Sequence, residues 1–203
     1  MNAVRCLALL AMLPAGAAGQ APARTCVWPG DPSVCSAWFV TEAGVHVRFT
    51  DVQPDDERVL VAYTVGWMGN VGPRAAAGVA LFGGGEGEFR GGVAARARRW
   101  LSRRSAVDAM AGVHLIGDAS SQDVRAGSPM VAVRLAYRDR LSAVARLDVL
   151  RLRCGFNCLP QFVINPNGTS TRTYLGAELG SQLGVAGFLL TAAVIGIAAA
   201  ACC

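Results

Sequence analysis

The most informative part of the sequence is residues 130–153, MVAVRLAYRDRLSAVARLDVLRLR, in which apolar side chains alternate with small or charged ones. Val131, Val133 and Leu135 form one set of this alternation, and Arg134 belongs to the other set. Residues two apart share a face of a β-strand but lie on opposite sides of a helix. The pattern therefore predicts two strands, and a short turn near 139–141 joins them as a hairpin.

The same period of two recurs through the centre of the chain. It predicts eight strands, at 44–50, 57–68, 74–83, 88–100, 105–116, 129–139, 142–153 and 171–179. Short connections near 69–73, 101–104 and 139–141 alternate with longer ones near 51–56, 84–87, 117–128 and 154–170. Such alternation indicates successive hairpins that can close on themselves and leave no free sheet edge. The expected fold is all-β: an eight-stranded antiparallel up-and-down (meander) barrel with a C-terminal apolar helix.

The charges within these strands keep to one face, and the opposite face is almost purely apolar. A soluble barrel would turn the charged face to water, whereas a membrane barrel would turn the apolar face to lipid. The predicted strands are long enough to cross a bilayer, since a tilted strand needs about 9–11 residues to do so. Apart from its charged residues, the charged face carries small or apolar side chains. The membrane orientation is therefore favoured, with a polar cluster in the lumen. Its predicted members are Arg96, Arg98, Asp108, Arg134, Arg146, Asp148 and Glu178. Candidate ion pairs are Asp108 with Arg96, and Arg134 with Arg146 and Asp148.

From Val45 to Leu179, the alternating residues and the alternation of short and long connections resemble those of the small eight-stranded outer-membrane β-barrels of Gram-negative-type bacteria. The resemblance is one of architecture and includes no diagnostic motif. It implies an envelope protein in a lipid bilayer, with a plugged lumen and no catalysis. The apolar extension past Gly180 departs from the class, whose chains usually end on their last strand.

The two ends of the chain differ from its centre. Residues 1–19 are predicted to be a signal peptide, because Arg5 precedes an apolar stretch and a small-residue cleavage zone. Residues 183–203, LGVAGFLLTAAVIGIAAAACC, carry no charge and are long enough for a transmembrane helix, although Ala and Gly dilute their apolarity. A Cys-bracketed N-terminal segment at 20–43 and the β-barrel at 44–182 complete the expected domains.

The cysteines favour disulfides. Six of the seven follow the predicted signal peptide, and an even number in an exported protein is typical of disulfide bonding. Cys26 with Cys35 and Cys154 with Cys158 are the simplest pairs. Crossed pairs and a four-cysteine zinc site are the alternatives, and the spacings fit zinc modules poorly.

Charge and motifs restrict the function. All 19 cationic residues are Arg, and the net charge of +5 is too small and too evenly spread to indicate a nucleic-acid partner. Phosphate-binding, dinucleotide-binding and nucleophile-elbow motifs are not found in the sequence. We therefore predict no catalytic, cofactor-binding or metal-binding residue.

The expected function is that of a non-enzymatic envelope protein in the outer membrane, with a structural role or one mediated by loop binding. Its surroundings are a lipid bilayer, and the sequence does not name a protein or ligand partner. One alternative is a periplasmic ligand- or partner-binding β-domain anchored by the C-terminal helix. Another is an envelope enzyme, in which Arg96, Arg134 and Asp148 would be the first residues to test. Acidic residues gather at the long-loop end, and Arg99, Arg103, Arg104 and Arg140 gather at the short-turn end.

Overall fold

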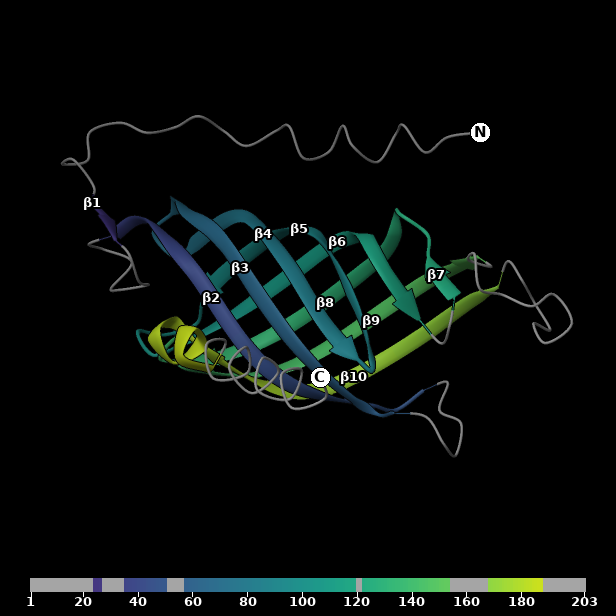
Figure 1. Cartoon of the computed structure of the whole chain (residues 1–203). Helices are drawn as coiled ribbons and strands as arrows, with labels where there is room; N and C mark the ends of the chain where they lie inside the picture. Colours follow the sequence, from purple (N-terminus) through teal and green to yellow (C-terminus); the bar gives the residue numbers. More distant parts are fainter. Residues whose placement is uncertain (1–23, 27–34, 51–56, 120–121, 154–167, 188–203) are drawn as a thin grey trace, which may run out of the picture.

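Eight strands of this chain form a closed barrel in a computed structural model that describes residues 24–26, 35–50, 57–119, 122–153 and 168–187. The strands are β2 (Cys35–Arg48), β3 (Val59–Gly72), β4 (Ala75–Glu86), β5 (Glu88–Trp100), β6 (Ser105–Ala119), β8 (Ser128–Tyr137), β9 (Leu141–Arg153) and β10 (Thr169–Gly180). Each pairs antiparallel with the next, and β10 pairs with β2 to close the wall (Figure 1). The predicted eight-stranded antiparallel barrel is confirmed.

Two short strands make the order more complex than the predicted meander. β7 (Gln122–Val124) follows β6 in the sequence but pairs with the ends of both β6 and β9, so that β6 pairs with β8 along the wall. β1 (Arg24–Cys26) pairs in parallel with the start of β2. The purely consecutive order was wrong because a strand of three residues is too short to show a period of two.

Two strand boundaries also differ from the prediction. β2 begins at Cys35 rather than at residue 44. β4 and β5 are separated by Gly87 alone, so the longer connection predicted at 84–87 is wrong. Gly87 has a φ of +75°, a conformation that glycine adopts without steric cost. The glycines of 83–85 belong to β4, and their lack of side chains made this stretch look like a loop.

The wall is apolar outside and polar inside. Val131, Val133 and Leu135 are 46%, 54% and 54% exposed on the outer face, whereas Arg134 between them is 2% exposed in the lumen. Apolar side chains fill part of the interior as well. At the short-turn end Trp38 packs edge-on against Trp100, with ring centroids 5.5 Å apart. The barrel is thus inverted relative to a soluble one.

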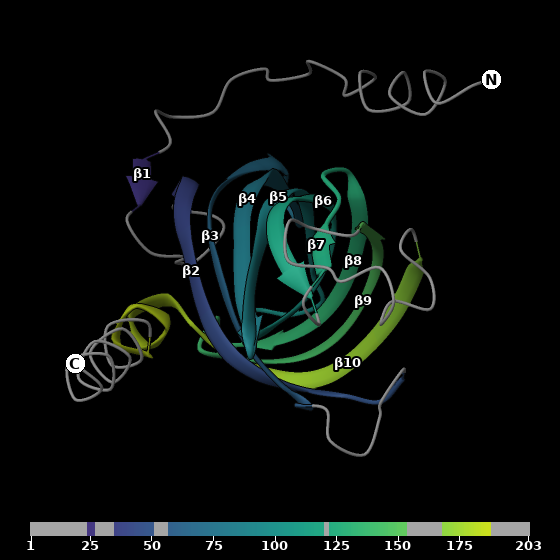
Figure 2. The same ribbon diagram turned by 45° about the vertical axis from the view of Figure 1, so that its right-hand side comes forward.

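A short helix at 181–187 lies outside the barrel against β2, as both views show (Figures 1 and 2). Thr41 on the outer face of β2 donates its hydroxyl to the carbonyl oxygen of Ser181 at 2.8 Å. Gly184 lies so close that a Cβ there would be 2.4 Å from the Thr41 carbonyl oxygen. Among the described residues, no helix has both the length and the apolarity needed to cross a membrane. Most of the predicted apolar helix, 188–203, lies outside the described residues.

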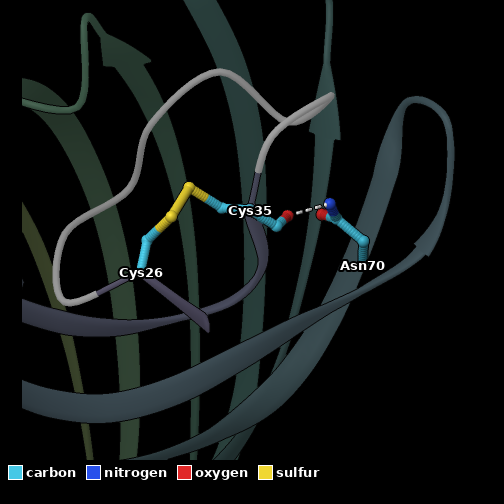
Figure 3. Close-up of a disulfide and its surroundings, with 3 residues drawn as sticks. All are labelled: Cys26, Cys35 and Asn70. Carbon is cyan, nitrogen blue, oxygen red and sulfur yellow. Dashed lines mark hydrogen bonds between the residues drawn. A yellow bond between two sulfur atoms is a disulfide. The ribbon is translucent and has the colours of Figure 1, made fainter. Parts of the chain in front are cut away.

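A disulfide joins Cys26 in β1 to Cys35 at the start of β2 (Figure 3). The side-chain amide of Asn70 on β3 donates to the Cys35 carbonyl oxygen at 2.5 Å. β1 is therefore attached to the wall covalently as well as by strand pairing. The predicted partners Cys154 and Cys158, and the predicted signal peptide at 1–19, lie outside the described residues.

Candidate functional site

The lumen holds two networks of charged side chains, one nearer each end of the barrel. The short-turn network consists of Glu42, His46, Arg96, Arg98, Asp108, Arg134 and Glu178. The loop-end network consists of Arg48, Glu86, Arg90, His114, Arg146, Asp148, Arg172 and Tyr174. Every one of these side chains is nearly or fully buried. Within a strand, alternate residues point to the same face. In this barrel the charged and histidine side chains of the two networks all carry even numbers.

In the short-turn network, Arg96 bridges two carboxylates. Its two terminal nitrogens each lie 2.7 Å from an oxygen of Glu42, and it also contacts Asp108. Asp108 accepts further hydrogen bonds from Arg98, at 2.6 Å from Nε and 2.8 Å from Nη2. Arg98 also contacts Asp139 in the turn between β8 and β9. This chain of pairs connects the lumen to its short-turn rim.

Arg134 occupies the other side of the same network. Its Nε donates to Glu178 at 2.6 Å, and its Nη2 donates to the Thr64 hydroxyl at 3.2 Å. His46 Nε2 lies 3.1 Å from the second oxygen of Glu178. The predicted pairing of Arg134 with Arg146 and Asp148 was wrong. The register between β8 and β9 sets Arg134 opposite Val144, while Asp148 stands opposite Met130, farther along the barrel.

In the loop-end network, Glu86 is surrounded by guanidinium groups. Arg172 Nη1 lies 2.9 Å from Glu86, Arg48 Nε lies 3.2 Å away and Arg90 Nη2 lies 3.5 Å away. The Tyr174 hydroxyl donates to the same carboxylate at 3.0 Å and accepts from Arg90 at 2.5 Å. One carboxylate thus neutralises part of the charge of three arginines.

Arg90 links this group to a second carboxylate, Asp148. Arg90 Nε lies 3.4 Å from Asp148, and Arg146 donates to both oxygens of Asp148 at 2.8 and 3.0 Å. His114 Nε2 lies 3.7 Å from Asp148. Both histidines are therefore buried beside a carboxylate that already pairs with arginine.

The networks differ in their charge balance. Counting the described lumen residues, the short-turn network has three arginines and three carboxylates, and the loop-end network has four arginines and two carboxylates. A buried charge is costly unless it is paired, and arginine can pair with two oxygens at once. The arrangement is one that fills an eight-stranded barrel, whose interior is just wide enough for side chains.

Sequence reasoning missed several members of these networks. Glu42 precedes the first predicted strand and Glu86 falls in a predicted loop, whereas Arg48 lies inside the predicted strand 44–50 but was not assigned to the lumen. The even residue number of each inward charge is the signal that could have found them, and it also marks Arg90 and Arg172. Among the described residues, no group of three or more His, Cys, Asp or Glu side chains is placed to hold a metal ion.

No protein-family model and no curated protein sequence matches the chain. One similar solved structure comes from work titled "De novo design of transmembrane beta-barrels". It has a TM-score of 0.38 and 10% identity, and the match covers 70% of this chain and 94% of that one. Another is the N-terminal β-barrel domain of Pseudomonas aeruginosa OprF, with a TM-score of 0.36 and 12% identity, covering 72% and 98%. Both of these solved structures are described as β-barrels.

Proposed function

We propose that this chain is a non-enzymatic β-barrel of the bacterial outer membrane, with a structural role or a role in binding through its loops. The observation that carries the proposal is the orientation of the wall. Val133 and Leu135 on β8 are each 54% exposed, whereas Arg134 between them is buried. Lipid is the solvent that makes this orientation favourable.

The apolar outer surface extends around the barrel rather than forming one patch. Large exposed apolar residues occur on every wall strand, for example Val45, Trp67, Val79, Val93, Leu115, Val133, Leu141 and Leu175. Soluble monomers rarely expose contiguous apolar patches above a few hundred Å². Leaving apolar surface in water costs about 25 cal/mol per Å², and a bilayer removes that cost.

The dimensions and the ends of the wall fit the same proposal. The eight wall strands are 10 to 15 residues long, and a tilted strand needs about 9–11 residues to cross a bilayer. Exposed aromatic side chains occur towards both ends of the wall: Tyr137 lies beside a short turn, and Phe49 and Phe89 lie at the opposite end. Aromatic residues at two levels are typical of barrels that meet two membrane–water interfaces.

The side chains in the lumen fill it, which supports a plugged barrel rather than an open channel. Arg96 joins Glu42 across the interior, and Arg90 joins Tyr174, whose strands β5 and β10 lie on opposite sides of the wall. We therefore place any binding function at the loops. The periplasmic alternative, in which a helix anchors a water-exposed domain, would leave the apolar wall in water, and we do not favour it.

Fractionation and gel mobility together test the proposal. The full chain, expressed in a Gram-negative host, is expected in the outer-membrane fraction. Without boiling it should migrate differently on a denaturing gel from the boiled sample, because closed barrels resist the detergent. Recovery in the soluble periplasmic fraction, or in the inner membrane alone with no heat-dependent shift, would contradict the proposal.

A further inference from the structure

The short-turn end of the barrel has an exposed surface that is rich in arginine. It comprises three turns: 73–74 between β3 and β4, 101–104 between β5 and β6, and 138–140 between β8 and β9. Six exposed arginines on or beside these turns form what we call the basic rim: Arg74, Arg99, Arg103, Arg104, Arg138 and Arg140. They contribute six positive charges to one end of the molecule.

The basic rim is continuous because backbone hydrogen bonds connect its turns. The Trp100 amide donates to the Arg74 carbonyl at 3.0 Å, which joins the first turn to the second. The Arg138 amide donates to the Arg104 carbonyl at 2.7 Å, which joins the second to the third. The six side chains therefore lie along one edge of the wall, where their positive potentials add together.

The basic rim carries little negative charge of its own. Asp139 is the one acidic residue in the three turns, and it contacts the buried Arg98. Within the described residues, none of the six arginines takes part in an ion pair. At the loop end, by contrast, exposed arginines have acidic neighbours: Arg153 lies 3.5 Å from Asp123, and Arg58 follows Glu57 in the sequence. The positive charge of the basic rim is thus available to an external anion.

The position of the rim relative to the apolar wall indicates which anion it meets. Arg99 faces outward on β5 and pairs in register with Val107, which in turn pairs with Leu135 on the apolar wall. The Arg138 guanidinium lies 5.5 Å from the ring centroid of the exposed Tyr137. Arginine directly beyond an apolar band, next to an interfacial aromatic residue, lies at the depth of lipid headgroups.

We propose that the basic rim binds the phosphates of anionic phospholipids in the leaflet on the short-turn side. This inference rests on the proposed membrane function and adds a class of lipid partner to it. Guanidinium groups pair with phosphate oxygens through two parallel hydrogen bonds. Each arginine near an anionic lipid surface strengthens binding by about fivefold, so three of them together have a measurable effect.

Native mass spectrometry of the full chain in neutral detergent tests the inference. The folded barrel is mixed with equal amounts of phosphatidylglycerol and phosphatidylcholine of the same acyl chains. The wild type should retain phosphatidylglycerol at least tenfold more than phosphatidylcholine. The variant Arg103→Gln/Arg104→Gln/Arg140→Gln should lose most of this preference. A matched control, Arg125→Gln/Arg151→Gln/Arg153→Gln, removes three exposed arginines from the loop end and should keep it.

Three outcomes would overturn the inference. The first is a folded wild type without lipid preference, and the second is an equal loss in both triple variants. The third is complete displacement of phosphatidylglycerol by equimolar inorganic phosphate, which would indicate a site for the free ion. Each leaves the proposed function intact, because the gel-mobility shift shows separately that the barrel has folded. Absence of that shift would contradict the proposed function, and the inference with it.

Discussion

Arg96 on β5 and Glu42 on β2 form a bidentate ion pair across the lumen, with both N–O distances at 2.7 Å. β3 and β4 lie between these strands in the wall, so the pair joins parts of the barrel that do not otherwise touch through the sheet. Asp108 and Arg134 also contact this pair, through Arg96 and Glu42 respectively. The interior of the barrel is therefore held together by charge pairing as well as by strand hydrogen bonds.

We predict that Glu42→Gln destabilises the folded barrel strongly. The substitution removes a carboxylate that Arg96 and Arg134 share, and breaking a buried pair costs about 3–5 kcal/mol. Urea unfolding in detergent micelles, followed by the gel-mobility shift, measures the free energy of unfolding. The control Glu57→Gln changes an exposed carboxylate and should shift it by about 0.5 kcal/mol or less. Equal effects of the two substitutions would contradict a paired lumen.

A second prediction concerns the outer wall. Val133 lies near the middle of β8, whereas Leu141 lies at the start of β9 beside a turn. Val133→Arg should lower the free energy of unfolding in lipid vesicles by about 2–4 kcal/mol, and Leu141→Arg by about 0–1 kcal/mol. The difference reflects the depth of each position in the bilayer. If Val133→Arg changed the stability no more than Leu141→Arg, the wall would not face lipid at that point.

The helix at 181–187 lies in close contact with β2. A side chain at Gly184 would meet the Thr41 backbone, with the carbonyl oxygen 2.4 Å and the carbonyl carbon 2.8 Å from the Cβ. We predict that Gly184→Val moves the helix off the wall, so that backbone amides of 181–187 exchange with solvent faster. The matched change Ala186→Val, on an exposed helix position, should leave exchange unaltered. Unchanged protection in Gly184→Val would show that this contact does not hold the helix.

The Cys26–Cys35 disulfide joins β1, which is not one of the eight wall strands, to the first residue of β2. The two cysteines are separated by nine positions in the sequence. A cross-link of this length reduces the entropy of the unfolded chain and so stabilises the folded state by about 2–3 kcal/mol. We predict that Cys26→Ser accelerates amide exchange in β1 while β5 and β6 stay protected. Mass spectrometry of exchanged peptides measures both regions in one experiment. Loss of protection in β5 to the same extent would mean that the disulfide supports the whole barrel.

The strands could be predicted from the sequence because each wall residue meets one of two environments. Val131, Arg134 and Leu135 show this directly, since a strand between lipid and a polar lumen requires apolar and charged residues to alternate. The start of β2 was missed because the helix at 181–187 covers its outer face there. Thr41 and Ala43 point outward but are each only 7% exposed, and small residues at that contact weakened the alternation.

The ion pairs could not be predicted in the same way. Arg134 pairs with Glu178, 44 residues away in the sequence, and Arg96 pairs with Glu42, 54 residues away. These partners meet because of the stagger between strands, which a residue pattern does not specify. Arg96 with Asp108 was predicted because β5 and β6 form a hairpin with a short turn, where the register leaves few choices.

The direction in which the apolar face points can be measured on the unmodified protein. With methyl-labelled Val and Leu in detergent micelles, NMR cross-relaxation reports which methyl groups touch the acyl chains. We predict contacts at Val131, Val133 and Leu135, and none at the interior residues Leu60, Val144 and Leu150, which are 0%, 3% and 0% exposed. Acyl-chain contacts at Leu60 and Leu150 with water contacts at Val133 would contradict the lipid-facing wall.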